Sequence, residues 1–494
     1  MKLKKFLTHN WEVITLVLLL ALAFFLRTHK LGTDLLFHRD QGLHSLSIWQ
    51  IWQERKISLL GHPSDVTGLI HSPVYYFLMA PSYALFQGSP VAASFFQVSL
   101  EVLSLPFLYL ALKKLINKKI ALATLLIYTV SYGWISYSRW LVNVTPIIPL
   151  THLLLFFLVN DKTKEHKSWR LFLISLLVGT ITQLNAAVGT FLLPLLIWLY
   201  RKPFSLKKLL TILVGFFLPA LPLFIFELRH NFVLFQSFIR FSQSSDQGLG
   251  FSFSTVWGNL KVFLKELQHI FSYPLGIIST AFFALGLLKV NKTKHSSLIY
   301  SFLFIPFLSL LIFQRGAISF FYISLLPLAT AIIVYGLFQL KDKIAWAILG
   351  LVVALNIYHL PRIYQPTNAL IPIGSNNLIT IQDRKNIIDW VYQKADGQQF
   401  SIWYYTIPYY QEEVWDYMFL YYAQPKYGYL PEKTSGFSPN ELDASTYFFA
   451  IYEPDEDRPG RLDQWLKQVT TNFGPVQDTF NSRDLYVHQN FIEK

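Results

Sequence analysis

The amino-acid sequence predicts an all-α polytopic membrane protein with about eleven transmembrane helices, followed by a small soluble C-terminal α/β domain. Of the 494 residues, 53% are hydrophobic and 14% are charged, whereas soluble domains carry roughly 25% charged residues. Aromatic residues reach 17%, as expected for lipid-facing helices and interfacial belts. The composition becomes polar after residue 360. We therefore predict a membrane domain over 1–360 and an extracytoplasmic domain over 361–494.

Apolar stretches define the predicted spans, and short basic runs between them define the orientation. The spans are 11–27, 91–112, 119–137, 141–160, 168–184, 186–200, 208–228, 271–289, 296–313, 318–339 and 343–360. Lys and Arg beside span ends are retained on the cytoplasmic side, so Lys2, Lys4 and Lys5 place the N-terminus inside. Each basic connection then faces the cytoplasm, and the C-terminus lies outside. These connections are 113–119, 161–167, 201–208, 289–294 and 341–343.

The first outer loop, residues 28–90, is expected to be structured and to lie against the bilayer. Its segment 71–86 is apolar but short, and it contains two prolines, so it is interpreted as interfacial or re-entrant. Counting it as a span would move every later basic connection outside. In residues 43–60, Trp alternates with Gln and Glu in the manner of a helix lying on the membrane surface. A second outer loop is expected over 229–270.

The C-terminal region has an alternating pattern that predicts a compact α/β unit. Helices are expected near 381–395, 411–423 and 460–471. Strands are expected near 399–405, 446–452, 475–480 and 483–489.

Charge and cysteine content exclude several classes of function. The net charge is +13, but the basic residues occur in short runs between apolar stretches rather than on one face, which argues against a nucleic-acid partner. The chain has no cysteine, which excludes disulfides, thiolate metal sites and cysteine nucleophiles.

Asp40 is the leading candidate for a catalytic residue, because a carboxylate in a partly apolar cleft serves as a general base or holds a divalent metal. The structural alternative is that Asp40 pairs with Arg39 or caps a helix that begins at Leu43.

Further polar and aromatic residues are predicted to meet at the same outer surface. They are Arg39, Gln41, His71, Tyr75, Tyr76, Arg139, Asn143, Glu227, Arg229, His230 and Arg315. Arginines at outer helix ends either anchor the chain at the interface or bind phosphate. The tyrosines either stack on a sugar or isoprenoid or belong to an aromatic belt. Glu101, inside the second span, needs a partner. Together these groups suit a ligand with an anionic head and a long apolar tail.

At these residues the chain resembles GT-C-fold membrane glycosyltransferases of the dolichyl-phosphate-mannose protein mannosyltransferase and aminoarabinose transferase type, close to glycosyltransferase family 39. The matching segments are Phe37-x-x-Asp40-Gln41-Gly42, His71-Ser-Pro73-Val-Tyr75-Tyr76, Ser138-Arg139 with Asn143, Gln183-Leu184, Phe226-Glu227-Leu-Arg229-His230 and Phe321-Tyr322. They run in order from the N-terminus to about residue 360.

The resemblance implies that Asp40 is the catalytic or metal-associated carboxylate and that Arg139 and Arg229 bind a lipid phosphate. A divalent metal is then a candidate cofactor, with Asp40, His71 and His230 as candidate ligands. The chain departs from its relatives at Gln41, where many have a second acid, and at Asn185, where Gln-Leu-His is common. These departures leave the metal and the sugar open.

The implied activity is inverting transfer of a hexose or pentose from a polyprenyl-phosphate donor to a protein, glycan or lipid acceptor. It would take place among membrane lipids at the outer face of the cytoplasmic membrane, with Asp40 as base. The alternatives are a transporter or flippase of a lipid-linked sugar without transfer chemistry, or a non-catalytic subunit.

The orientation predicts a labelling pattern in intact cells. Because the chain contains no native cysteine, Asn440→Cys should react with a membrane-impermeant maleimide, and Ile116→Cys should react only after permeabilisation. The reverse pattern would overturn the predicted topology.

Overall fold

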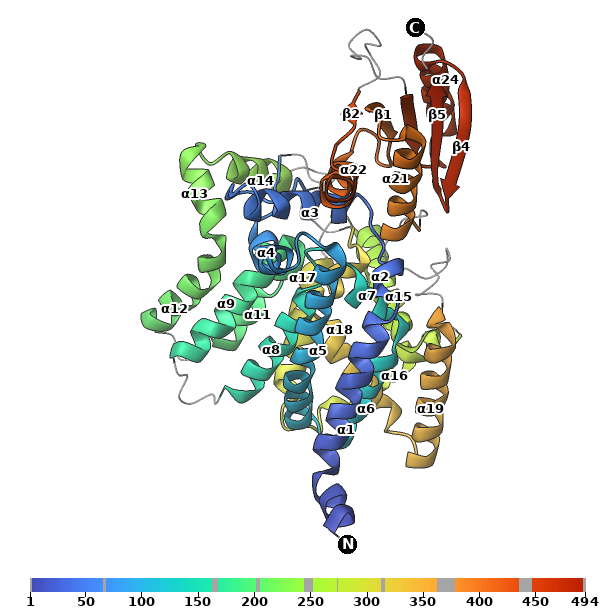
Figure 1. The fold of residues 1–494 in the computed structure, drawn as a ribbon. Helices are drawn as coiled ribbons and strands as arrows, with labels where there is room; N and C mark the ends of the chain where they lie inside the picture. Colours follow the sequence, from blue (N-terminus) through green and yellow to red (C-terminus); the bar gives the residue numbers. More distant parts are fainter. Residues whose placement is uncertain are drawn as a thin grey trace. The chain divides into compact units, whose positions relative to one another are not determined.

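The computed structural model describes residues 2–64, 68–161, 168–200, 205–243, 252–272, 274–311, 316–361, 378–434 and 447–491. The chain divides into two compact units (Figure 1). The first, here called the helical unit, comprises Met1–His29, Ile57–Met79 and Ser94–Ile363. The second, the mixed unit, comprises Lys30–Lys56, Ala80–Ala93 and Tyr364–Lys494. Residues 30–56 and 80–93, which lie in the segment predicted as the first outer loop, thus group with the C-terminal residues.

The helical unit contains a helix at every predicted span. Its first helices are α1 (Lys2–Thr28), α5 (Pro90–Leu115), α6 (Lys118–Val130), α7 (Tyr132–Arg139), α8 (Ile147–Asn160), α9 (Ser168–Leu184), α10 (Ala186–Thr190) and α11 (Leu193–Tyr200). There follow α12 (Leu206–Phe217), the 3-10 turn η1 (Leu218–Ala220), α13 (Leu221–Arg229), α14 (Val233–Gln243), α15 (Phe253–Phe271) and α16 (Gly276–Val290). The last are α17 (Ser296–Leu311), the 3-10 turn η2 (Ser319–Tyr322), α18 (Leu326–Leu337) and α19 (Asp342–His359). The helix α4 (Val74–Leu85) lies in the segment 28–90, which is predicted to be the first outer loop.

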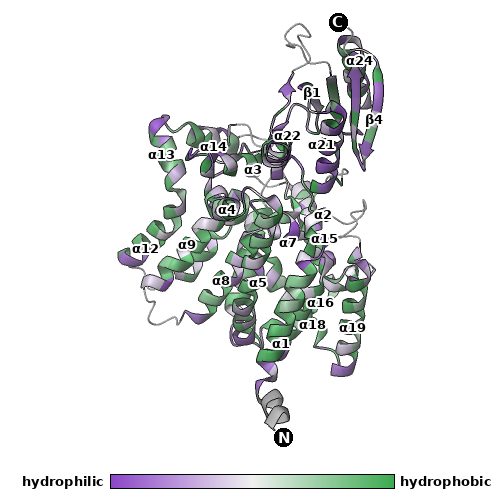
Figure 2. Ribbon diagram, in the orientation of Figure 1, coloured by the Kyte–Doolittle hydropathy of each residue, from purple (hydrophilic) through white to green (hydrophobic). Residues whose placement is uncertain are grey.

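Length and hydropathy indicate which helices can cross a bilayer. Among the described residues, four are long and apolar enough alone, and up to six if two bent helix pairs each count as one span. Five further apolar helices are shorter, and Figure 2 shows hydrophobic residues along α5, α9 and α18. The chain is therefore a multi-pass membrane protein, and about eleven crossings remain a prediction.

One of the predicted connections is helical. The expected outer loop 229–270 is wrong as a loop: it contains α14 and most of α15, because its apolar residues recur with helical spacing. The pair α6 and α7 is bent by 61° at Ser131, and α15 and α16 are bent by 107°. The first bend divides the single predicted span 119–137, and the second lies near the boundary between the predicted loop 229–270 and the predicted span 271–289.

Small residues let helices of this unit approach closely. A Cβ placed on Gly336 would lie 1.9 Å from the carbonyl oxygen of Phe282, and one on Gly286 would lie 2.2 Å from that of Ile332. This contact joins α16 to α18. Close backbone approach is how membrane helices gain packing energy where lipid removes the hydrophobic driving force.

A buried ion pair links four helices of the helical unit. Arg27 Nε lies 3.2 Å from Glu101 Oε1, and both side chains are at most 1% exposed. The same Glu101 oxygen accepts hydrogen bonds from the hydroxyls of Tyr128 and Ser138, each at 2.8 Å. Arg27 also donates to the carbonyl of Tyr128 at 3.0 Å. Glu101 therefore has the partner that its position in a span required.

The mixed unit contains a five-stranded sheet. Its helices are α2 (Leu31–Asp34), α3 (Arg39–Trp52), α21 (Ile381–Ala395), α22 (Glu413–Met418), the π-helical turn η3 (Phe419–Ala423), α23 (Gln424–Tyr427) and α24 (Pro459–Phe473). Its strands are β1 (Phe400–Tyr405), β2 (Glu432–Lys433), β3 (Tyr447–Tyr452), β4 (Val476–Ser482) and β5 (Leu485–Phe491). Each helix and strand predicted after residue 380 has a counterpart among them.

The sheet has the order β2-β1-β3-β5-β4, parallel at β2, β1 and β3 and antiparallel at β5 and β4. On one face, α24 packs Trp465 and Phe473 against Trp403 and Phe448. On the other, Trp390 of α21 contacts Phe449 and Phe480. Strand β1 is buried at every residue, as expected for a strand covered on both faces.

Helix α3 belongs to the mixed unit because it packs on α22. A Cβ on Gly42 would lie 2.3 Å from the Cα of Val414, so the helices touch backbone to backbone. Trp49 of α3 meets the ring of Tyr417 edge-on at 6.1 Å, and the Tyr417 hydroxyl donates to the carbonyl of Gly88.

The buried ion pair predicts strongly coupled effects on stability. Removing either charge leaves the other buried and uncompensated, so Arg27→Met or Glu101→Leu should each destabilise the protein by about 3–5 kcal/mol. The double variant should lose less than the sum of the two, which thermal unfolding of the detergent-solubilised protein would measure. Glu54→Gln, at an exposed pair with Lys56, is the control and should cost at most about 1 kcal/mol. Additive losses in the double variant would contradict the coupling.

Candidate functional site

Asp40 lies in the first turn of α3, which begins at Arg39 rather than at Leu43. Its carboxylate is therefore not the N-cap of that helix, and the predicted capping alternative is wrong in this form. The predicted pairing is present: Asp40 Oδ1 lies 3.6 Å from Arg39 Nη1. The Asp40 side chain is 53% exposed, so it is accessible to a reacting hydroxyl.

The residues flanking Asp40 stabilise the start of α3. Gln41 is 2% exposed, and its Oε1 accepts a hydrogen bond from the backbone N–H of His38 at 2.9 Å, as in a capping box. The Gln41 amide is thus engaged in the fold rather than presented to a ligand. Desolvation of the imidazole, together with the nearby Arg384 guanidinium, lowers the pKa of His38 to about 3. The residue at the N-cap is therefore uncharged near pH 7.

The predicted His71 and tyrosine cluster is mostly closed in this structure. The rings of His62 and His71 stack with centroids 4.2 Å apart, and their backbones are joined by a hydrogen bond of 2.9 Å from His71 N to His62 O. Tyr75 and Tyr76 are each 2% exposed. Their rings are packed within the fold, so here they offer no open stacking surface.

Arg139 and Asn143 donate hydrogen bonds to backbone carbonyls at helix ends in the helical unit. Arg139 ends α7 and is 6% exposed. Its Nη1 donates to the carbonyls of Arg27 at 3.0 Å and His29 at 2.8 Å, which satisfies acceptors at the end of α1. Asn143 donates to the carbonyl of Leu184 at 2.6 Å, at the end of α9.

The Glu227, Arg229 and His230 cluster separates into a helix cap and two exposed side chains. Glu227 accepts hydrogen bonds from the backbone N–H groups of Leu234 at 3.0 Å and Phe235 at 2.9 Å. These are free donors in the first turn of α14, so Glu227 caps this helix from the end of α13. His230 stacks on Phe226 with a centroid distance of 4.0 Å. Arg229 ends α13 and is exposed.

Arg315 lies outside the described residues. Within the described ranges, no three His, Asp or Glu side chains gather closely enough to hold a metal ion. The three candidate ligands instead contact Arg39, His62 and Phe226 respectively.

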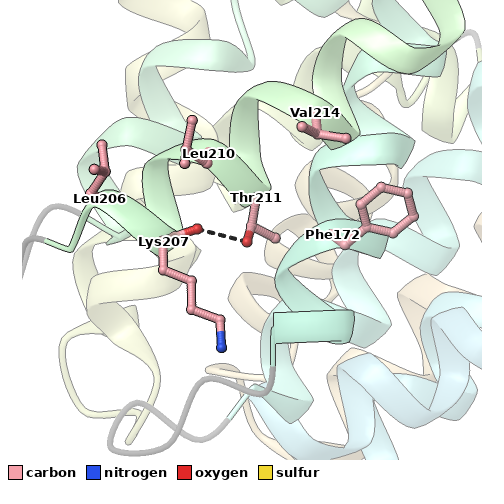
Figure 3. Close-up of a pocket in the computed structure, with 6 residues that line it drawn as sticks. All are labelled: Phe172, Leu206, Lys207, Leu210, Thr211 and Val214. Carbon is pink, nitrogen blue, oxygen red and sulfur yellow. Dashed lines mark hydrogen bonds between the residues drawn. The ribbon is translucent and has the colours of Figure 1, made fainter.

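A hollow between α9 and α12 lies apart from the predicted site residues. It is lined by Phe172, Leu206, Lys207, Leu210, Thr211 and Val214, and Figure 3 shows the Thr211 hydroxyl bonded to the Lys207 carbonyl. Leu206, Leu210 and Val214 are each more than half exposed. On a membrane helix such a surface is a lipid contact, and its lining contains no carboxylate or imidazole.

A buried ion pair in the mixed unit was not predicted from the sequence. Arg384 Nη2 lies 3.1 Å from Glu453 Oε1, with side chains 1% and 4% exposed. Burial raises the pKa of Glu453 and lowers that of Arg384, and each charge opposes the shift of the other. A signal was present, since Arg384 shares the apolar helical spacing of Ile381 and Ile388.

The fold and these residues define a multi-pass membrane protein with an exposed carboxylate and an exposed arginine at two helix ends. Residues 70–226 match the family described as dolichyl-phosphate-mannose-protein mannosyltransferase. No curated protein sequence matches the chain.

Solved structures show the fold across almost the whole chain. ArnT from Cupriavidus metallidurans bound to undecaprenyl phosphate aligns with a TM-score of 0.59 and 12% identity, over 97% of this chain and 98% of that one. The apo state of the same protein aligns with a TM-score of 0.58 and 12% identity, over 98% of each chain. The resemblance to GT-C-fold proteins of the mannosyltransferase and ArnT type is therefore confirmed.

The role of Glu227 can be tested by its stability effect. Glu227→Ala removes both acceptors from the start of α14 and should destabilise the protein by about 0.5–2 kcal/mol, whereas Glu227→Gln retains one acceptor and should lose less. Thermal unfolding of the detergent-solubilised protein would measure both. Unchanged stability of Glu227→Ala would contradict the capping role.

Proposed function

We propose that this protein transfers a sugar from a polyprenyl-phosphate donor to an acceptor at the outer face of the cytoplasmic membrane. The class, a membrane glycosyltransferase with a lipid-linked donor, is supported by the family match and by the fold shared with ArnT. The observation that carries the proposal is the exposed carboxylate of Asp40 in the first turn of a helix, within the segment through which the chain resembles such transferases.

In the proposed reaction, Asp40 removes the proton of the acceptor hydroxyl as its oxygen attacks the anomeric carbon. The new glycosidic bond forms while the bond to the lipid phosphate oxygen breaks. The phosphate leaves as an anion, and because the acceptor oxygen attacks the face opposite the breaking bond, the configuration at the anomeric carbon is inverted.

Arg229 is proposed to stabilise the departing phosphate. Negative charge grows on this group in the transition state, and a guanidinium neutralises it with directed hydrogen bonds. Arg229 is exposed at the end of α13 and is therefore accessible to a lipid head group. Arg139 is proposed in a supporting role, because two backbone carbonyls already bind its guanidinium.

The first measurement identifies the sugar and the class of acceptor. Mass spectrometry of envelope glycans and glycolipids from cells lacking the protein should reveal a product without one hexose or pentose. The purified protein should form that product from the corresponding polyprenyl-phosphate sugar.

Substitution of Asp40 separates transfer from binding. Asp40→Asn keeps the size of the side chain but removes the proton acceptor, so turnover should fall by roughly 10²–10⁴-fold with donor affinity nearly unchanged. Arg229→Ala should instead weaken donor binding by about 1.5–3 kcal/mol. Glu54→Gln and Arg240→Ala, at exposed positions, are the matched controls and should change neither quantity. Normal turnover by folded Asp40→Asn would favour a transporter of the lipid-linked sugar.

A further inference from the structure

The mixed unit contains a buried arginine whose contacts converge on the start of α3. Arg384 Nε donates to the carbonyl oxygen of Phe37 at 2.7 Å, across 347 positions of sequence. Its Nη2 bonds Glu453 at 3.1 Å, and its guanidinium lies 4.8 Å from the ring centroid of Trp415. One side chain thus joins the residues before α3, the helix α22 and the residue that follows β3.

The chain entering α3 is held as a short extended pairing. Phe37 N–H donates to the carbonyl of Ile379 at 3.1 Å, and Ile381 N–H donates to that of Leu35 at 2.9 Å. Leu36 and Thr380 form the antiparallel bridge between them. Arg384 binds the carbonyl of Phe37, so both backbone polar groups of this residue are held by the C-terminal part of the chain.

Asp40 follows Phe37 by three residues, so the position of the Phe37 backbone restricts the position of Asp40. The first helical hydrogen bond, from Gly42 N–H to the carbonyl of His38, measures 2.9 Å. Backbone contact between Gly42 and Val414 prevents α3 from approaching α22 more closely, and Figure 1 shows α3 beside α22. The first turn of α3 is thus restrained from both sides.

A buried ion pair is costly to desolvate and is weak support for stability by itself. Hydrophobic residues of similar volume would fill the space between α21 and β3 equally well. They could not donate a hydrogen bond to the carbonyl of Phe37, three residues before Asp40. The guanidinium of Arg384 therefore holds the backbone before α3 in place, in addition to filling space in the core.

We propose that Arg384, held by Glu453, is a positioning residue that sets the location of the Asp40 carboxylate. The proposal rests on the proposed function of Asp40 as the base. It gives the C-terminal part of the chain a specific task in the reaction, although neither Arg384 nor Glu453 touches substrate. Misplacement of a catalytic group by about 1 Å costs up to about 100-fold in rate.

The test compares Arg384→Lys with Arg461→Lys in the full-length protein. Arg461 is a matched control because it also pairs with an acid of the mixed unit, Asp455, at 2.6 Å, and its Nε donates to the hydroxyl of Tyr405. Lysine keeps the charge but not the forked geometry. Arg384→Lys should lower kcat about 10–100-fold with KM for the donor within about twofold, and Arg461→Lys should leave both unchanged.

A spin-label distance provides a readout that does not depend on the substrate. Labels at Gln50→Cys in α3 and Gln464→Cys in α24 both lie within the mixed unit. Their distance distribution should broaden or shift in Arg384→Lys and remain unchanged in Arg461→Lys. If Arg384→Lys does not fold, Glu453→Gln is the second variant. It keeps the hydrogen bond from Arg384 to Phe37 but weakens the bond between Arg384 and residue 453, so it should show smaller changes in the same direction.

The outcomes distinguish this proposal from the proposed function. An inactive Asp40→Asn together with normal kcat and an unchanged distance in Arg384→Lys would overturn the positioning role alone. Full activity of Asp40→Asn would overturn the catalytic assignment. Equal losses of kcat in Arg384→Lys and Arg461→Lys would make the effect a general one of the mixed unit and would also overturn the positioning role.

Discussion

The requirement that a charge removed from water must be paired inside the protein governs both units of this chain. In the helical unit, Arg27 and Glu101 meet with at most 1% exposure, and the hydroxyls of Tyr128 and Ser138 saturate the shared oxygen. In the mixed unit, Arg384 and Glu453 form a second buried ion pair, with side chains 1% and 4% exposed. Each pair draws together segments far apart in the sequence. Since an unpaired partner would be costly, each pair permits few alternative arrangements of the segments it joins.

The same requirement decides which polar residues are available for chemistry. Backbone groups at helix ends have no partner within their helix, and in this protein nearby side chains satisfy several of them. Glu227 caps α14, and Arg139 binds the carbonyls at the end of α1. Gln41 accepts from the residue before α3. Asp40 and Arg229 differ from these because they are exposed, which is why the proposed chemistry centres on them.

Much of the fold was predictable because its signals are local. The apolar stretch of each span is continuous in sequence, so its length and composition predict a helix without knowledge of its neighbours. The alternation of patterns after residue 380 likewise predicted α21, β1, β3 and α24 within a few residues. The prediction of a loop over 229–270 was wrong because it rested on the polar residues at the centre of this segment. Amphipathic helices, α14 and α15, lie on either side of them.

The order of residues along the chain is enough to predict a multi-pass membrane protein, its candidate spans and a set of residues resembling those of GT-C transferases. Composition, apolar length and ordered motifs are properties of contiguous residues and need no tertiary information. Three other features became visible in the folded chain: Glu227 caps a helix, Glu101 pairs with Arg27, and Arg384 binds the residue three positions before Asp40. The donor and acceptor of the hydrogen bond from Arg384 to Phe37 are separated by 347 positions. No local sequence pattern indicates which distant carbonyl a buried guanidinium will bind.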